Sequence, residues 1–138
     1  MPIPLDPSRP IYLQIMEEIK KRAVRGAYAA GAQLPSVRDM AREMEVNPNT
    51  IARVYMELER EGFIVTRRGH GSFLTEDAGR LDRERSRLGR EATRRFISVI
   101  HELGLSVEQR RDIASFVELS FTGKSDEETS SREDGDVP

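Results

Sequence analysis

The chain has 138 residues, of which 37% are hydrophobic and 33% charged, and it has no cysteine. This composition suits one globular domain, or one module with an appendage, and it excludes a disulfide framework and a thiolate site. No apolar run approaches the ~20 residues that span a bilayer, and the start lacks the pattern of a secretory signal. We therefore expect a cytoplasmic protein without a membrane partner.

The charge is unevenly distributed along the chain. The formal net charge is −2, whereas a nucleic-acid binder usually carries a basic excess. Residues 1–77 hold 11 basic and 11 acidic residues, residues 80–95 are rich in arginine, and residues 124–138 are acidic. The acidic tail has almost nothing to bury and is predicted to be disordered. The arginine-rich stretch is either a solvated helical face with ion pairs or a contact to flanking DNA.

A short arm and three helices are predicted first along the chain. Four prolines make residues 1–10 an extended arm, and apolar residues at helical spacing predict a helix over residues 11–25. A second, short helix follows Pro35, with Ser36 as its cap and Asp39 completing a pair that resembles a capping box. Asn47 caps a third helix that begins at Pro48 and runs to about residue 61. Two helices joined by so short a turn form a helix-turn-helix.

A β-hairpin is predicted directly behind the third helix. Residues 63–66 and 72–75 are β-prone, and between them lies the sequence Arg67-Arg68-Gly69-His70-Gly71, a turn rich in glycine and positive charge. A hairpin at this place in the chain is a wing.

Two further helices are predicted after residue 78, with an interruption possible at Gly89. Ser106 and Gln109 form a capping box for the last helix. Helices of this length cannot bury their apolar stripes alone, so we expect a two-fold homodimer. Its interface residues are predicted to be Leu88, Phe96, Ile100, Leu103, Ile113, Phe116, Val117 and Phe121.

The predicted fold class is thus mainly α with a small β-hairpin. The N-terminal arm occupies residues 1–10, and a winged helix-turn-helix for binding double-stranded DNA occupies residues 11–77. A short two-helix dimerisation region covers residues 78–123, and the acidic tail covers residues 124–138.

The start of the third helix carries the residues expected to touch DNA. Asn47, Asn49 and Thr50 cluster where free backbone donors and the helix dipole favour phosphate. Arg53 shares their outward face. Asparagine can pair with adenine, and arginine can bind guanine through two hydrogen bonds. Arg38, at the start of the preceding helix, is placed to hold a phosphate.

The wing tip adds Arg67, Arg68 and His70 as further contacts. Gly71, like Gly69, lets the backbone approach a groove closely. Such a tip can enter the minor groove, where arginine responds to groove width more than to sequence. We assign these residues to positioning, and Asn49, Thr50 and Arg53 to discrimination.

Five short motifs follow one another along this part of the chain: Pro10-Ile11-Tyr12, Gly31-x-x-Leu34-Pro35-Ser36-x-Arg38, Val46-Asn47-Pro48-Asn49-Thr50, Tyr55-x-x-Leu58-x-x-x-Gly62-Phe63 and Arg67-Arg68-Gly69-x-Gly71-Ser72-Phe73-Leu74. Through these motifs, residues 11–75 resemble the DNA-binding domain of the GntR family of bacterial regulators. The Val-Asn-Pro-Asn-Thr form with a short two-helix C-terminal region is similar to the YtrA subfamily. That resemblance implies a homodimer on an inverted-repeat operator, usually acting as a repressor and often near transporter genes.

The chain departs from other GntR subfamilies at Pro48 and Ala52, where those subfamilies carry arginine. Their base contacts therefore do not transfer to this chain, and Arg53 is expected to replace them.

Two other classes of function are weighed against this one. A winged-helix module that binds proteins without reading DNA would need a hydrophobic outward face on the third helix, with which Asn49, Thr50 and Arg53 disagree. An enzyme would need a nucleophile–base pair or a metal cluster, and none is visible. No cofactor is expected. A small-molecule effector of unknown identity could bind between the C-terminal helices or at the dimer interface.

Overall fold

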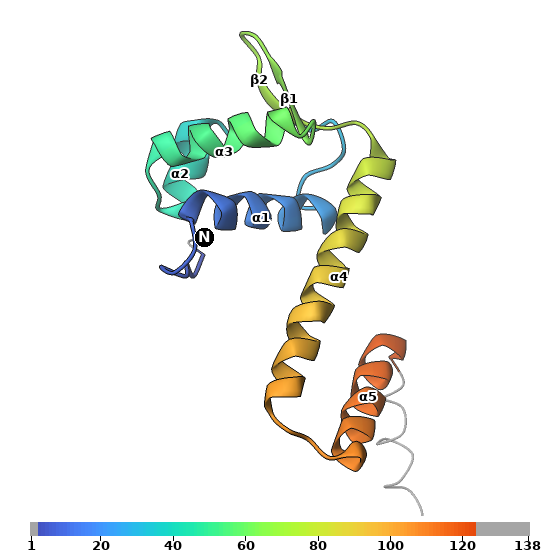
Figure 1. The fold of residues 1–138 in the computed structure, drawn as a ribbon. Coiled ribbons are helices and arrows are strands. Elements are labelled where there is room, and N and C mark those ends of the chain that lie inside the picture. Colours follow the sequence, from blue (N-terminus) through green and yellow to red (C-terminus); the bar gives the residue numbers. More distant parts are fainter. Residues whose placement is uncertain (1–2, 124–138) are drawn as a thin grey trace, which may run out of the picture. The chain divides into compact units, whose positions relative to one another are not determined.

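The computed structural model describes residues 3–123, and the chain divides into two compact units, residues 1–92 and residues 93–138. The elements follow in the order α1 (Ile11–Val24), α2 (Val37–Met44), α3 (Pro48–Arg60), β1 (Ile64–Arg67), β2 (Gly71–Leu74), α4 (Ala78–Glu102) and α5 (Val107–Thr122) (Figure 1). This confirms the predicted fold class, a winged helix-turn-helix followed by C-terminal helices. Among residues 3–123, no helix has both the length and the apolar character that a bilayer crossing needs. The predicted acidic tail lies outside the described residues.

The segment before α1 is held against that helix, unlike the extended arm that its prolines predict. The Gln14 side chain accepts a hydrogen bond from the Asp6 backbone N–H and donates one to the Asp6 carbonyl, each at 2.7 Å. The Arg9 backbone N–H donates to the same carbonyl at 3.3 Å, which closes a turn. An aspartate followed by proline favours such a turn, so the prolines here start a turn as well as an extended segment.

The helix-turn-helix has the predicted caps at Ser36 and Asn47, and its helix bounds agree to about one residue, but within the described residues Asp39 does not complete a capping box at Ser36. The Ser36 hydroxyl accepts from the Asp39 backbone N–H at 3.1 Å, and the Asn47 side chain accepts from the Asn49 backbone N–H at 2.8 Å. Between the two helices, Glu45 has a left-handed backbone with φ of 56°. This conformation ends α2 and lets α3 leave in a new direction after only three residues.

The core of unit 1 lies between the three helices and the base of the hairpin. One side of α3 is completely buried, since Ile51, Val54 and Leu58 have no exposed surface. They pack with apolar side chains of α1, α2 and the strands, which are Ile15, Met16, Ile19, Ala23, Met40, Ala41, Met44, Ile64 and Leu74. Tyr55 extends this face, and its hydroxyl donates to the Pro35 carbonyl at 2.6 Å. Burial raises the pKa of Tyr55 above its ordinary value, so the hydroxyl stays a donor.

The hairpin has the predicted position, but each of its strands is shifted by one residue toward the tip, from the predicted 63–66 and 72–75 to Ile64–Arg67 and Gly71–Leu74. Ile64 pairs with Leu74 and Arg67 with Gly71. Residues 31–34, which lie in the connection between α1 and α2, pair with the outer edge of β2. The Leu34 backbone N–H donates to the Ser72 carbonyl, and the Leu74 N–H donates to the Ala32 carbonyl, each at 2.8 Å. The strand β2 is therefore hydrogen-bonded along both edges, to β1 on one edge and to residues 31–34 on the other.

An ion-pair cluster ties the first part of α4 to the helix-turn-helix. Lys20 is nearly buried in α1, and its ammonium lies 2.7 Å from Glu61 and 3.5 Å from Glu84. Glu84 also accepts hydrogen bonds from Arg87. Arg85 donates to the Val24 carbonyl at 2.7 and 2.9 Å. Leu81 and Leu88 are buried on this part of α4, so it belongs to the folded body of unit 1.

Unit 2 begins within α4, which runs without interruption through Gly89, contrary to the break considered from the sequence. Its second helix, α5, has the predicted capping box: the Ser106 hydroxyl accepts from the Gln109 N–H, and the Gln109 side chain accepts from the Ser106 N–H. Most large apolar side chains of this unit are exposed, and no residue of α5 is buried. Leu81 and Leu88 thus serve a core in unit 1, whereas the large apolar side chains of residues 93–123 are exposed or only half-buried.

The first prediction concerns the hydrogen bond that joins α3 to the start of α2. Tyr55→Phe removes the donor and leaves the Pro35 carbonyl without it in a mostly buried position. We expect the free energy of unfolding to fall by about 1 kcal/mol, measured by urea denaturation. Thr66→Val, which removes an exposed hydroxyl bonded to Glu59, is the control and should change it less. Equal losses would show that the bond from Tyr55 to Pro35 contributes no more to the free energy of unfolding than the exposed bond from Thr66 to Glu59.

The second prediction concerns pH. Hydrogen bonds from Arg87 lower the pKa of Glu84 below its ordinary value of 4.5, and the charge of Lys20 adds to this. A carboxyl group whose pKa is lower in the folded state stabilises that state at pH above about 4.5, and the effect is lost as pH falls through the lowered pKa.

Glu84→Gln should therefore destabilise the protein at pH 7 by less than about 1 kcal/mol, because the pair is partly solvated. The gap to wild type should close as the pH falls below 4. Urea denaturation across that range measures it, with Asp82→Asn, at a carboxylate 74% exposed on the same helix, as the control. A gap that widens on acidification would contradict the assignment.

Candidate nucleic-acid interface

The side of α3 opposite its buried face is a continuous exposed stripe. Asn49, Arg53, Met56 and Arg60 follow one another at spacings of four, three and four residues, so they lie in line along the helix. All four are exposed, and Met56 keeps 60% of its surface. Asn47 is exposed just before the helix and its side chain is used as the cap. The helix thus presents amide, guanidinium and thioether groups to solvent along its whole length.

A groove lies beside the first turn of α3, between this turn and the start of α1. It has a volume of about 440 Å3 and is lined by Pro10, Ile11, Tyr12, Asn49, Thr50 and Arg53. The structure therefore brings the three predicted discriminating residues together at one place. It adds the start of α1 to them, which the sequence argument did not include in the site.

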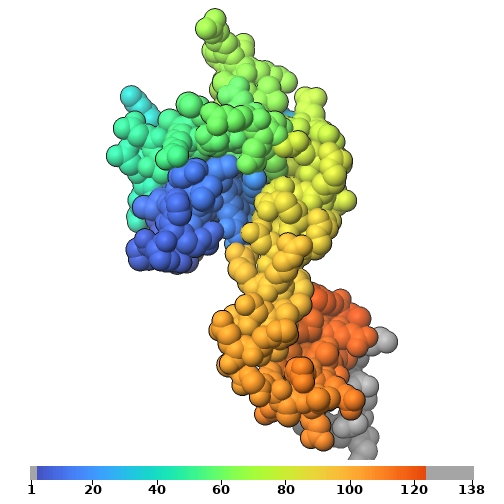
Figure 2. All heavy atoms as spheres, viewed as in Figure 1, coloured from blue at the N-terminus to red at the C-terminus, as the bar shows by residue number. Residues whose placement is uncertain are grey.

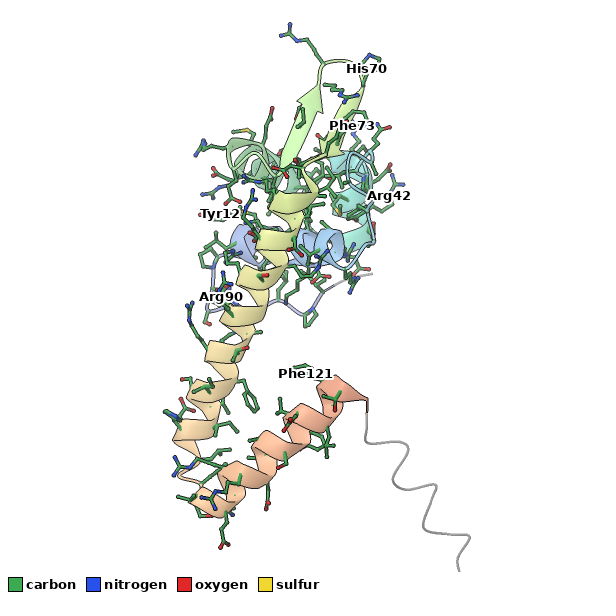
Figure 3. All side chains as sticks on the ribbon, turned by 90° about the vertical axis from the view of Figure 1, so that its right-hand side faces the viewer. Tyr12, Arg42, His70, Phe73, Arg90 and Phe121 are labelled. Atoms are coloured by element: carbon green, nitrogen blue, oxygen red, sulfur yellow. The ribbon has the colours of Figure 1, made fainter. Side chains whose placement is uncertain are left out.

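The Arg53 guanidinium lies over the ring of Tyr12, with its carbon 3.7 Å from the ring centre. Tyr12 is near the start of α1 (Figure 3). Within residues 3–123, Arg53 has no carboxylate partner. Arg38 and Arg68 are also exposed and free of ion pairs in this part of the chain, so three predicted contacts keep their charge for an external anion.

The hairpin projects from the helices of unit 1 and carries the second group of predicted contacts (Figures 1 and 2). His70 lies at its tip (Figure 3). Arg68 is exposed in the same turn. Arg67 is partly engaged: its guanidinium lies 4.7 Å from the centre of the Phe73 ring and 3.7 Å from a Glu76 oxygen.

The tip is braced from the side by Gln33. Its side-chain amide donates to the His70 carbonyl at 2.7 Å. Gly71 has φ of 108°, and a Cβ at this position would lie 2.8 Å from the Gln33 amide nitrogen. Glycine is therefore required here both for its backbone conformation and for the brace. The exposed tip is a supported structure and not a free loop.

The arginines at the start of α4 are mostly engaged with carboxylates of the same helix or its cap. Arg83 pairs with Asp77, Arg85 with Asp82, and Arg87 with Glu84 and Glu91. For these three arginines, of the two interpretations left open from the sequence, this favours a solvated face with ion pairs.

Three residues that the sequence argument did not place in the site now belong to it. The sequence argument used Tyr12 only as an apolar residue of the first helix and as part of the family resemblance. Met56 lies on the stripe of Arg53 and could have been found by helical spacing. Gln33 had no signal in the sequence, because its contact joins residues 37 positions apart.

Comparison with known proteins gives consistent results. Residues 11–74 match the family described as "Bacterial regulatory proteins, gntR family". The uncharacterized HTH-type transcriptional regulator YhcF of Bacillus subtilis is 46% identical, over 80% of this chain and 93% of the relative. The HTH-type transcriptional repressor YtrA of the same organism is 38% identical, over 78% of this chain and 85% of the relative.

A solved structure, the GntR family transcriptional regulator from Listeria monocytogenes, superimposes with a TM-score of 0.71 at 42% identity. It covers 83% of this chain and 97% of its own. The similarity extends beyond the winged helix-turn-helix into the C-terminal helices. The chain therefore belongs to the gntR family of bacterial regulatory proteins, and it is a DNA-binding transcriptional regulator rather than an enzyme.

Proposed function

We propose that this chain represses transcription from the cytoplasm by binding an inverted-repeat operator as a homodimer, with α3 in the major groove and the hairpin at the minor groove. The observation that carries this proposal is the contrast between the two sides of α3. One side is fully buried, and the other presents polar side chains to solvent, among them the Arg53 guanidinium, which has no carboxylate partner within residues 3–123. A helix of this kind fits the major groove, which admits an α-helix and offers distinct donors and acceptors on each base pair.

Each predicted contact has a role that its position supports. Asn49, Thr50 and Arg53 discriminate between base pairs, because they share the groove beside the first turn of α3. Arg38 and Asn47 hold phosphates, the former by charge and the latter as a cap beside the positive end of the helix. Arg67, Arg68, His70 and Gly71 place the hairpin against the duplex.

Met56 adds an apolar contact to this set. It lies between Arg53 and Arg60 on the exposed stripe, where a thioether suits the methyl group of thymine.

Repression is supported by the relative named as a repressor, the YtrA protein of Bacillus subtilis, at 38% identity. The rival function, a protein-interaction module without DNA reading, would need an apolar outward face on α3. Met56 is the one apolar side chain on that stripe.

The homodimer is supported by the exposed apolar side chains of unit 2. Phe116 and Phe121 keep 72% and 86% of their surface exposed, and Phe96, Ile97, Val99 and Leu103 keep about half. Of these side chains, Phe96, Ile97 and Phe121 line a mainly apolar groove of about 550 Å3 between α4 and α5, together with Ile100, Ile113 and Val117. Apolar patches of this kind mark interaction sites, and a second copy supplies a matching surface by two-fold symmetry.

The predicted interface changes at one residue. Leu88 has only 9% of its surface exposed in unit 1, so it has little left for a partner and we remove it. Phe96, Ile100, Leu103, Ile113, Phe116, Val117 and Phe121 remain. A second copy that fills the groove leaves no room there for the small-molecule effector considered from the sequence.

The function is tested by selecting duplexes from a randomised library with the full-length protein. We expect an enriched inverted repeat whose half-sites are related by two-fold symmetry. Enrichment of no sequence above the starting library would overturn sequence-specific binding. Enrichment of a single half-site without symmetry would overturn the dimeric arrangement.

The third prediction separates base contact from general attraction. Arg53→Ala should weaken binding to the selected duplex by about 1–3 kcal/mol and relax preference at one base pair. Fluorescence anisotropy on the duplex and its single-base-pair variants measures both effects. Arg42→Ala, at an exposed arginine of α2 that faces Asp39, is the control and should change neither. Equal loss on selected and scrambled duplexes would contradict the role of Arg53.

The fourth prediction concerns the hairpin. Arg68→Ala removes a cation that holds phosphate, so it should weaken binding to all sequences alike. The slope of log affinity against log salt should flatten by about 1. Titrations at four salt concentrations on selected and scrambled duplexes measure it. An unchanged slope would show that Arg68 does not contact phosphate.

The fifth prediction concerns assembly. Wild-type protein should sediment as a dimer at micromolar concentration, and Phe116→Glu with Phe121→Glu should give a monomer, because burial of the charges opposes association. Val65→Glu, at an exposed apolar residue of the hairpin, is the control and should remain dimeric. A wild-type monomer would overturn the interface.

A further inference from the structure

Tyr12 and Arg53 form a contact that neither the fold nor the charge pattern requires. The guanidinium carbon lies 3.7 Å from the centre of the ring, which is the distance of direct stacking. Arginine on an exposed helical face ordinarily samples many rotamers. Here one face of its guanidinium is covered by an aromatic ring from a different helix.

Stacking of this kind leaves the hydrogen-bonding capacity of arginine intact. A guanidinium is planar, and its five N–H groups point outward in the plane, so the ring covers a face and none of the donors. Within residues 3–123, no acceptor takes a hydrogen bond from Arg53. The group is therefore held and still able to donate both bonds that a guanine edge accepts.

The ring is a firm support because Tyr12 is itself fixed. It is half-buried and packs against the apolar core of unit 1. It lies in the first turn of α1, directly after Pro10, where Gln14 fastens the preceding segment through the Asp6 backbone. Tyr12 and Arg53 both line the groove that Asn49 and Thr50 also line. The support and the discriminating residues therefore belong to one site.

We infer that Tyr12 is a positioning residue, which holds the Arg53 guanidinium in place for a base edge. This inference rests on the proposed function. Tyr12 lowers the entropy that Arg53 loses on binding DNA, since ordering a long side chain beforehand removes that cost from the association step. Its effect should be about three- to tenfold in affinity.

A contrasting role for the same contact makes the opposite prediction. If Tyr12 drew Arg53 away from the duplex, removal of the ring would free the arginine and tighten binding. The sign of the change therefore decides between positioning and sequestration.

The test uses the full-length protein and the duplex enriched from the randomised library. Tyr12→Leu removes the ring face, Tyr12→Phe keeps it, and Leu13→Ala changes an exposed apolar neighbour of Tyr12 that does not line the groove. Each is measured alone, and Tyr12→Leu is also combined with Arg53→Ala. Anisotropy gives affinity for the selected duplex and for each single-base-pair variant, and a thermal melt checks folding.

We expect Tyr12→Leu to weaken binding about three- to tenfold and to flatten preference at the base pair that Arg53→Ala flattens. Tyr12→Phe and Leu13→Ala should bind like wild type. The double variant should equal Arg53→Ala alone, because the ring acts through the arginine. Additive losses, tighter binding by Tyr12→Leu, or equal losses from Tyr12→Phe and Tyr12→Leu would each overturn the inference.

A second measurement does not depend on DNA. The Nε–H proton of Arg53 should resonate upfield in the free protein because the ring current of Tyr12 shields it, and Arg53→Lys identifies the signal. Tyr12→Phe should preserve the shift. A signal at the position of an unstacked arginine overturns the inference even if Tyr12→Leu fails to fold. A selection without any enriched duplex, with the upfield signal present, overturns the proposed function and leaves the stacking intact.

Discussion

The helix α3 is packed against the core along one side and exposed to solvent along the other. The other contacts of unit 1 hold the helix in this arrangement. Two hydrogen bonds to a base edge demand a well-defined position of the side chain that donates them. The three core residues on the inner side of α3 have no exposed surface, and the Tyr55 hydroxyl fixes the same side to the start of α2. Caps at Ser36 and Asn47 set where each helix begins. The outer side therefore gains its order from contacts made on the inner side.

The Arg53 cation of this surface is ordered by an aromatic ring rather than by a carboxylate. Arg53 lies over Tyr12, whereas Arg67 lies over Phe73 and also approaches Glu76. A carboxylate partner would neutralise the charge that attracts phosphate, whereas a ring holds the cation and preserves its charge. This explains how a chain with a net charge of −2 can present a cationic surface. Several of its acidic residues pair with cations away from Arg53, on α4 and in the Lys20 cluster.

Much of the fold could be predicted from the sequence because its signals are local. Caps such as Asn47 followed by Pro48, and the Ser106–Gln109 box, involve residues within three positions of each other. The features that escaped prediction are contacts between distant segments. Residues 31–34 resemble a loop because only β2 gives them strand geometry. Leu88 lies on the same helical stripe as Phe96, and periodicity cannot tell which of them a core will cover. The stacking of Arg53 on Tyr12 likewise joins two helices that spacing alone cannot relate.

The pairing of residues 31–34 with β2 has a consequence for protein engineering. The hairpin and this segment are one structural cassette, although some thirty residues of α2 and α3 separate them in the chain. Consider a chimaera that receives the hairpin of another regulator but keeps its own residues 31–34. The residue of the new hairpin at position 71 would then have to fit against the Gln33 side chain of the original protein. Exchange of the hairpin between relatives therefore requires that two separate pieces of sequence be exchanged at once.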